Sequence, residues 1–271
     1  MSQTPKRHFL VVAATSRCAR LFIKKALLSG HDVTALCRAS DDESALTRMR
    51  KVLDETEITD PPQQPADGSG TLKASNRNIL EASTYADLLA ADETIDGLCC
   101  FVGTTSSRQA MSPFTRLYTD TIRSILDGMA ESRSVEVLYH SSVGAGGEPV
   151  NAYVYWPDNY PSMSWAIAWV APVFRNVARS ERLFEKHQKP HTDYITFRPG
   201  SLKDHSAEGN YEVLVDLSKK RPFKVELSHM KISIGREDVA DEMLRVATLP
   251  AEERKALYGS SLYLADRNDR S

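Results

Sequence analysis

The sequence predicts an α/β fold in which helices cover both faces of a doubly wound parallel sheet. Two observations predict it. Short apolar runs of strand length alternate along the chain with longer segments whose apolar residues recur at helical spacing. One run, residues 95–103, is continuously apolar and ends in glycine, as expected of a central parallel strand whose carboxyl end lies at a ligand crevice.

The first unit of this pattern, residues 8–38, reads as strand, helix and strand. Residues 9–13 are a short apolar run, and helical spacing follows at Ala19, Phe22, Ile23, Ala26 and Leu27. Ser29 and Gly30 end the helix, and residues 31–36 alternate as a second strand. Such a crossover is right-handed. Its first turn should therefore lie at a helix N-terminus, where these folds hold a dinucleotide pyrophosphate.

The remaining elements continue the alternation. Prolines and glycines fill residues 58–70, which predicts a surface loop. We expect helices at residues 41–51, 84–91, 113–129 and 172–189, and a final one that starts within 234–240 and stops at Pro250. The further strands are expected at residues 71–74, 95–103, 135–142, 193–197, 211–216 and 260–265.

Composition indicates a single soluble domain spanning residues 1–271, with 41% hydrophobic and 26% charged residues. The net charge of -2 gives no electrostatic footprint for nucleic acid. The first apolar run is too short for a signal peptide, and none approaches the roughly 18 residues of a membrane span. A cytoplasmic location is expected, without a membrane partner. The four cysteines, Cys18, Cys37, Cys99 and Cys100, are expected to be buried thiols in a reducing compartment.

Three motifs carry a family resemblance. The turn after the first strand is similar to a Gly-Ala-Thr-Gly-x-x-Gly loop, with Ala13, Ser16 and Ala19 in the three glycine places. Residues 30–38 and the Arg-Pro-Gly at 198–200 resemble the corresponding segments of the same family. The chain thus resembles the atypical short-chain dehydrogenases, in particular the NmrA-like and biliverdin-IXβ/flavin reductase-like group. That resemblance implies a Rossmann-type fold with a small C-terminal substrate-binding lobe, expected from residues 143–170 and 200–233.

The resemblance also implies an NADP(H) site, although its loop glycines are replaced. The cofactor contacts carried over from it are Ala13, Thr15, Ser16, Arg17, Cys18, Asn78, Gly103 and Thr104. Arg38 ends the second strand, where an arginine accommodates the 2′-phosphate of NADP. Both Arg17 and Arg38 could instead be solvated surface arginines.

The acid–base pair of ordinary short-chain dehydrogenases is missing. No tyrosine has a lysine four residues on, and no lysine occurs between Lys73 and Lys186. Aligning Glu181 with the family's glutamate places Val173 and Val177 at the tyrosine and lysine positions. Ketone reduction is therefore disfavoured, whereas direct hydride transfer to a conjugated acceptor, with the proton from solvent, is not.

Two serines are the predicted catalytic residues. Ser141 and Ser142 end the strand at 135–142, where ligand-facing hydroxyls of open α/β sheets belong. We expect at least one to face substrate and polarise a carbonyl, although turn serines also cap local backbone. His140 precedes them on the opposite face and is expected to be a packed core residue. No metal-ligand cluster or Ser-His-Asp pattern stands out.

All three tryptophans lie in an aromatic segment between residues 151 and 169. It could be a satellite core over the sheet edge, or a substrate wall that suits a flat hydrophobic ligand. On the second interpretation the substrate-binding residues are Tyr153, Tyr155, Trp156 and Trp165, with Arg108 at the opposite rim.

The sequence therefore favours an NADP(H)-associated enzyme of small-molecule metabolism, secondary metabolism included, that reduces a hydrophobic conjugated substrate. A cyclase or isomerase that only positions a reactive intermediate is the first alternative. An NADP(H)-sensing regulator is the second. The substrate's identity and the oligomeric state are left open.

Overall fold

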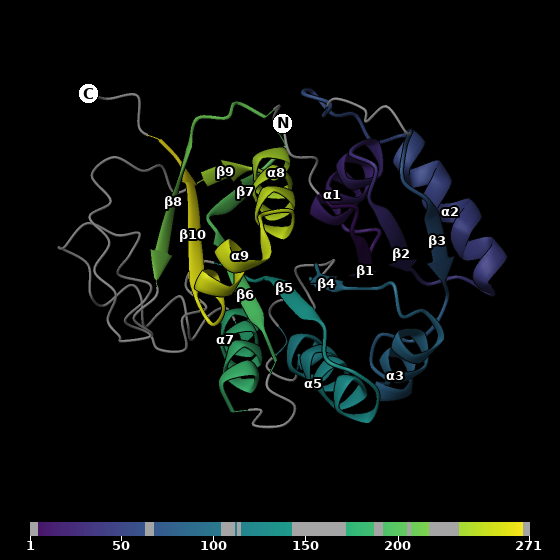
Figure 1. Cartoon of the computed structure of the whole chain (residues 1–271). Coiled ribbons are helices and arrows are strands. Elements are labelled where there is room, and N and C mark those ends of the chain that lie inside the picture. Colours follow the sequence, from purple (N-terminus) through teal and green to yellow (C-terminus); the bar gives the residue numbers. More distant parts are fainter. Residues whose placement is uncertain are drawn as a thin grey trace.

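A computed structural model describes residues 5–62, 68–103, 112, 115–142, 172–186, 192–204, 207–216 and 233–267. Its main sheet confirms the predicted doubly wound α/β fold (Figure 1). Seven of the eight strands run parallel, and the last strand in the order pairs antiparallel with its neighbour. The order is β3 (Leu72–Ser75), β2 (Asp32–Leu36), β1 (His8–Val12), β4 (Gly97–Cys100), β5 (Glu136–His140), β6 (Tyr194–Pro199), β10 (Ser261–Asp266) and β8 (Tyr211–Asp216).

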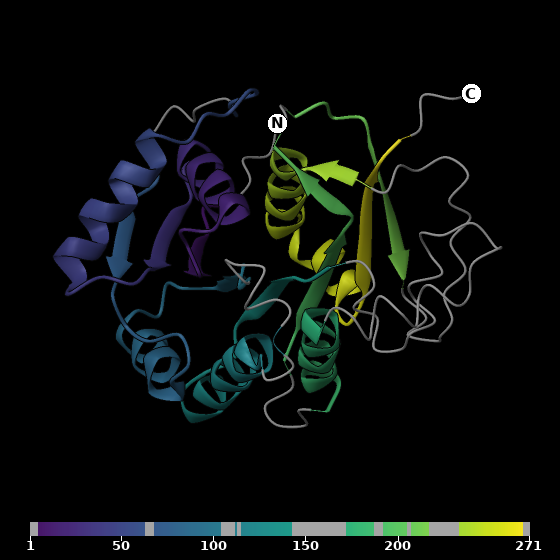
Figure 2. The same ribbon diagram turned by 180° about the vertical axis from the view of Figure 1, so that it is seen from behind.

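Helices cover both faces of this sheet, as the two opposite views show (Figure 1 and Figure 2). One face packs against α1 (Arg17–Leu28), α2 (Asp42–Asp54), α8 (Arg236–Ala247) and α9 (Ala251–Leu257). The other packs against α3 (Ala82–Ala91), α5 (Leu117–Glu131) and α7 (Pro172–Lys186). A separate parallel pair is formed by β7 (Ser201–Lys203) and β9 (Ser233–Gly235).

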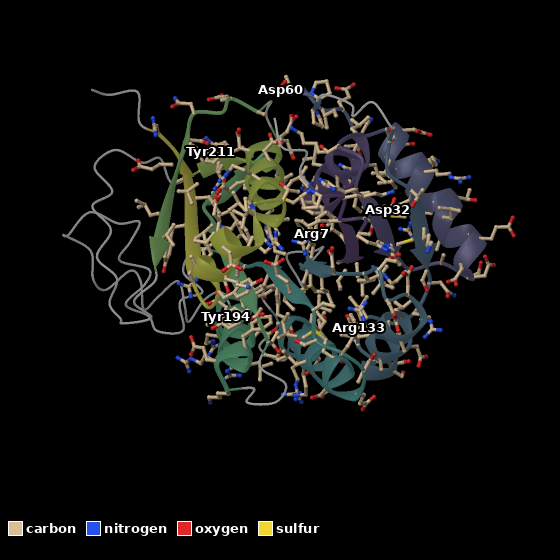
Figure 3. The ribbon with its side chains drawn as sticks, viewed as in Figure 1. Arg7, Asp32, Asp60, Arg133, Tyr194 and Tyr211 are labelled. Carbon is tan, nitrogen blue, oxygen red and sulfur yellow. The ribbon has the colours of Figure 1, made fainter. Side chains whose placement is uncertain are left out.

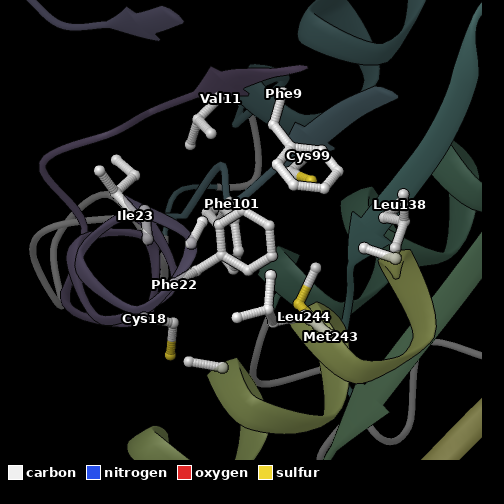
Figure 4. Packing of buried hydrophobic residues seen from close by; sticks show 14 of the residues in the cluster. Phe9, Val11, Cys18, Phe22, Ile23, Cys99, Phe101, Leu138, Met243 and Leu244 are labelled. Atoms are coloured by element: carbon white, nitrogen blue, oxygen red, sulfur yellow. The ribbon is translucent and has the colours of Figure 1, made fainter. Parts of the chain in front are cut away.

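Strand alternation divides the core into two layers. Cys99 belongs to the apolar cluster beneath α1 and α8, whereas Cys100 belongs to the cluster beneath α3, α5 and α7. The opposite orientation expected for this pair is therefore confirmed, and all four cysteines are buried and free. In the first layer Phe22 packs edge-on against Phe9 and tilted against Phe101, each at 5.5 Å between ring centroids (Figure 4).

Three element boundaries differ from expectation. The helix expected from Pro113 begins at Leu117, where Oδ1 of Asn176 on α7 accepts the Tyr118 amide at 3.0 Å and so caps the first turn. The strand expected over residues 95–103 is shorter, because only Gly97–Cys100 pairs with its neighbours. The helix that stops at Pro250 is not the last, since α9 follows it with acidic residues in its first turn and basic residues in its last.

The amino ends of the central strands are fixed by an ion-pair network around the buried Arg7, which is labelled in Figure 3. Its guanidinium contacts Glu136 at 2.8 Å and Asp96 at 3.0 Å, and donates to the carbonyl of Ala247 at 2.5 Å. Arg254 reaches the same Glu136 carboxylate at 3.1 Å. This edge of the sheet is thus closed by internal partners, which leaves the carboxyl edge for a ligand.

The described residues contain neither a membrane-spanning helix nor a metal-binding cluster. No helix there is long and apolar enough to cross a membrane. No group of histidines, cysteines and carboxylates in that part of the chain could hold a metal ion.

Candidate active site

A cavity of about 390 Å³ opens at the carboxyl edge of the sheet. The starts of α1 and α8 line it on one side, and Tyr118 of α5 and Val177 of α7 line it on the other. Its floor comes from the ends of β4, β5 and β6. The cavity therefore straddles the sheet at the place where open α/β folds bind ligands, and its volume suits a small molecule.

The loop between β1 and α1 keeps the backbone of a glycine turn without the glycine. Ala13 has φ of 58°, in the left-handed region, and is the one non-glycine residue there among the residues described. The turn is closed by the Ser16 amide, which donates to the Ala13 carbonyl at 3.0 Å. The substitution at the first glycine place has therefore left the turn intact and stores strain in it.

The serine at the second glycine place directly changes the N-terminus of α1. Ser16 is the N-cap of α1, and its hydroxyl accepts the Ala19 amide at 3.3 Å. One donor that a phosphate could have used is therefore already satisfied. Behind it Cys18 lines the cavity, where burial raises the pKa of its thiol to about 12. This thiol is not a nucleophile at neutral pH.

Two arginines and one aspartate meet at the cavity mouth. Asp204, just after β7, forms ion pairs with Arg17 on α1 and with Arg236 on α8, the latter at 2.6 Å. Arg17 and Asp204 are more than half exposed, whereas Arg236 is 15% exposed and lines the cavity. The predicted phosphate contact Arg17 is thus occupied by an internal carboxylate.

The other predicted cofactor residues are spread along the edge. Arg38 is exposed beyond β2, and its side chain has no partner among the described residues. Gly103 lines the cavity after β4. Asn78 is exposed, and its amide donates to Glu81 at 2.8 Å within a local turn. Outside the described residues lie Thr104 and the proposed substrate contacts Arg108, Tyr153, Tyr155, Trp156 and Trp165.

Both predicted serines line the cavity, and Ser141 belongs to a buried hydrogen-bond chain. Its hydroxyl donates to Oε1 of Glu181 on α7 at 2.5 Å. The Glu181 carboxylate accepts Nε of Arg198 at 3.0 Å and Nη2 at 2.5 Å, and the Arg198 guanidinium continues to the Tyr263 hydroxyl. The proton of Ser141 is therefore committed to Glu181, and this geometry does not support a carbonyl-polarising role for it.

The structure confirms the expected packing of His140 and adds that the residue lines the cavity. Its ring packs against Phe101 at 5.7 Å between centroids, as a core residue would, but it also lines the cavity. Desolvation, with a smaller contribution from the nearby Arg236, lowers the pKa of His140 to about 4. The ring is therefore neutral at pH 7. As alternation along β5 predicts, His140 packs in the layer of Phe101, whereas Ser141 contacts α7 in the opposite layer. Both residues line the cavity because the strand ends there.

Val177 occupies the cavity wall at the position that the family alignment gives to the lysine. It is 2% exposed and faces the cavity from α7, and no lysine lines the cavity among the residues described. Sequence reasoning missed Tyr118, which lines the cavity from the start of α5. Its place could have been found from the helix that follows the central strand, but the helix start was expected four residues too early.

Comparison with known proteins gives matches of structure alone. No family model and no curated protein sequence matches the chain. A candidate NADH-flavin reductase from Streptococcus pneumoniae has a TM-score of 0.59 at 14% identity, over 96% of this chain and 99% of that one. ChuY, an anaerobilin reductase from Escherichia coli O157:H7, gives 0.61 at 16% identity, over 97% and 98%. A short-chain dehydrogenase/reductase from Veillonella parvula gives 0.55 at 14% identity, over 97% and 95%.

The chain shares the Rossmann-type fold of these neighbours. These neighbours agree with the resemblance that the sequence motifs indicate, and they extend it over nearly the whole chain. Within this fold the present residues fit a nicotinamide dinucleotide in three respects: the left-handed turn at Ala13, the open N-terminus of α1, and the exposed Arg38 at the end of β2. Ser16 departs from the fit by using one amide of that N-terminus.

Proposed function

We propose that the protein is an NADP(H)-dependent reductase of a hydrophobic, conjugated small molecule. The observation that carries this proposal is the cavity itself: it lies at the cofactor end of a dehydrogenase fold, yet Val177 stands where a proton-relay lysine would be. When bound, NADPH supplies a hydride. The protein's own residues then need to hold the two partners in contact and exclude water.

The cofactor would be held by the first crossover. Arg38 would contact the 2′-phosphate from the end of β2, and Arg17 would contact a phosphate after releasing Asp204. The N-terminus of α1 adds favourable dipole and amide contacts for the pyrophosphate. These roles agree with the positive charge at the mouth, where two arginines face one aspartate.

The substrate would lie against apolar walls. Phe101, Val102 and Leu202 line the cavity together with Val177, which suits a flat conjugated molecule. Neither Cys18 nor His140 can relay a proton at pH 7, because the pKa of the thiol is about 12 and that of the imidazole about 4. The acceptor we propose is one whose reduced form takes its proton from water. The flavin and tetrapyrrole reductases named among the neighbours support this choice of acceptor.

A second function is favoured by one observation. The hydroxyl of Ser16 occupies the Ala19 amide at the phosphate end of α1, as expected if the cofactor role has been lost. The same cavity could then serve a cyclase or isomerase that acts by positioning alone.

Anaerobic mixing of the protein with NADPH and an acceptor distinguishes the reductase from the cyclase or isomerase. We expect the nicotinamide absorbance to fall faster with protein than without it when FMN or biliverdin is present, and a primary isotope effect with NADPH deuterated at one face of C4. Saturable NADPH binding without absorbance loss for either acceptor would contradict the reductase.

A further inference from the structure

A tyrosine at the start of α5 brings a hydroxyl to the apolar side of the cavity. Tyr118 lines the cavity, is 8% exposed, and belongs to the same apolar cluster as the cavity residues Val102 and Val177. Its hydroxyl lies at the end of β4, because a methyl group on Gly103 would be 4.0 Å from that oxygen. Gly103 is itself an exposed residue of the cavity lining. The phenol oxygen therefore lies at the open end of this wall.

The backbone that carries Tyr118 is held in place from α7. No side chain of α5's own N-cap residue caps this helix. Instead Oδ1 of Asn176, which is 4% exposed, accepts the amides of Tyr118 at 3.0 Å and Thr119 at 3.4 Å. Nδ2 of the same side chain donates to the Thr119 hydroxyl at 3.1 Å. Because the helix start is fixed by buried contacts, a ligand that meets the Tyr118 hydroxyl pays little to order it.

Hydride addition to a conjugated carbonyl compound moves charge onto the carbonyl oxygen. The hydride of NADPH forms a C–H bond at the far carbon of the C=C–C=O system, and the C=C electron pair shifts towards the carbonyl. The carbonyl π pair then moves onto oxygen as an enolate, while NADPH becomes NADP⁺ and water later supplies the proton. A hydrogen-bond donor at that oxygen stabilises the transition state more than the ground state. A tyrosine hydroxyl is such a donor.

We propose that the Tyr118 hydroxyl donates a hydrogen bond to a carbonyl oxygen of the substrate, which makes Tyr118 a catalytic residue supplied by α5. The substrate class is then a flat conjugated carbonyl compound, such as an enone, a quinone or an unsaturated lactam. Tyr118 keeps its proton in this role, so no lysine partner is required. The proposal rests on the proposed function in one point, that this cavity is the substrate site.

The first test uses two probes of the same shape that differ in one acceptor, 2-naphthaldehyde and 2-vinylnaphthalene. Their dissociation constants are measured by NMR titration without NADPH. We expect the wild type to bind the aldehyde about three- to tenfold more tightly, as one net hydrogen bond provides. Tyr118→Phe keeps the ring and should abolish the preference. The matched control is Tyr258→Phe, which removes a partly buried hydroxyl at the C-cap of α9, outside the cavity lining, and should keep the preference.

The second test observes the carbonyl itself. Naphthaldehyde labelled with ¹³C at the carbonyl is bound to each protein, and its C=O stretch is isolated by difference infrared spectroscopy. A hydrogen bond weakens the C=O bond. The stretch should therefore lie at lower frequency in the wild type and Tyr258→Phe than in Tyr118→Phe.

The third test measures turnover in the anaerobic assay with NADPH and biliverdin. Removing one donor to a developing oxyanion lowers kcat about 100-fold or more, so we expect that loss in Tyr118→Phe, with NADPH affinity unchanged. A kcat equal to that of the wild type would overturn the catalytic role.

Equal affinity of the two probes for the wild type, a preference that survives in Tyr118→Phe, an unshifted carbonyl stretch in that variant, or no saturable binding of the aldehyde would each overturn the proposal. The two probe measurements do not use the cofactor. A failure of NADPH to bind would thus remove the reductase, and the probes would still decide whether Tyr118 binds the carbonyl.

Discussion

Ser141 on β5 and Glu181 on α7 are joined by a 2.5 Å hydrogen bond that couples the cavity to a buried ion pair. Glu181→Gln would leave the 3% exposed Arg198 without its charge partner. We expect it to lower the free energy of unfolding by about 3–5 kcal/mol, as breaking a buried pair does. Ser141→Ala keeps both Arg198 contacts and should cost only about 1 kcal/mol. Urea unfolding of the two variants measures the difference, and equal losses would show that the serine is part of the same stabilising unit.

The left-handed Ala13 predicts a stabilising substitution. Ala13→Gly removes strain of about 1–2 kcal/mol and adds roughly 0.5–1 kcal/mol of unfolded-state entropy, so the net gain should be about 0.5–1 kcal/mol. The matched control is Ala90→Gly, the same change at an exposed position of α3, which should destabilise. Thermal unfolding compares them. Destabilisation by both variants would mean that the turn at Ala13 is not strained.

Asp204 is predicted to compete with the cofactor for Arg17. In Asp204→Asn the two arginines at the cavity mouth lose their internal anion, and NADPH should bind about three- to tenfold more tightly at low salt, with the gain shrinking as ionic strength rises. Asp87→Asn is the control, since Asp87 on α3 is equally exposed and pairs with Arg77, and neither residue lines the cavity. Calorimetric titration measures the NADPH affinity of each variant. Equal affinities for the wild type and both variants would contradict the competition between Asp204 and the cofactor.

Glu237 predicts a pH dependence of stability. Burial would raise the pKa of its carboxyl, but hydrogen bonds from Lys25 at 3.0 Å and from the Thr59 amide and hydroxyl at 2.8 Å hold it at about 2, below its ordinary value of 4.5. A lowered pKa gives stability that is complete above pH 4.5 and is lost as pH falls towards 2, here about 3 kcal/mol.

Acid titration of wild type against Glu237→Gln checks this dependence. The stability gap between them should close between pH 5 and pH 2, while the exposed Glu253→Gln should track the wild type throughout. A gap that stays constant with pH would assign Glu237 a purely steric role.

Local pattern was enough to predict most of the elements, although not the short β7, β9 and α9. Apolar spacing placed the first crossover, and alternation put Cys99 and Cys100 in different layers. It also located the edge that carries Ser141 and the position of Val177. These features depend on residues close in sequence, whose orientation follows from strand and helix periodicity.

The rest depends on contacts between distant segments. The hydrogen bond from Ser141 to Glu181 joins residues that are 40 positions apart in the sequence. The ion pair of Arg17 with Asp204 joins residues that are 187 positions apart. Neither contact produces a regular spacing of residues from which it could be predicted. Alternation placed His140 in the correct layer, but it could not show that the residue also lines the cavity, because that depends on where neighbouring strands end.

The carboxyl-edge cavity and the first crossover together form the proposed NADP(H) site. Calorimetric titration of the wild type and Arg38→Ala with NADPH and NADH tests this assignment most directly, with Arg50→Ala on α2 as the control. We predict saturable NADPH binding, at least tenfold tighter than NADH, a preference that Arg38→Ala removes and Arg50→Ala keeps. No saturable binding of either nucleotide to the wild type would contradict the assignment.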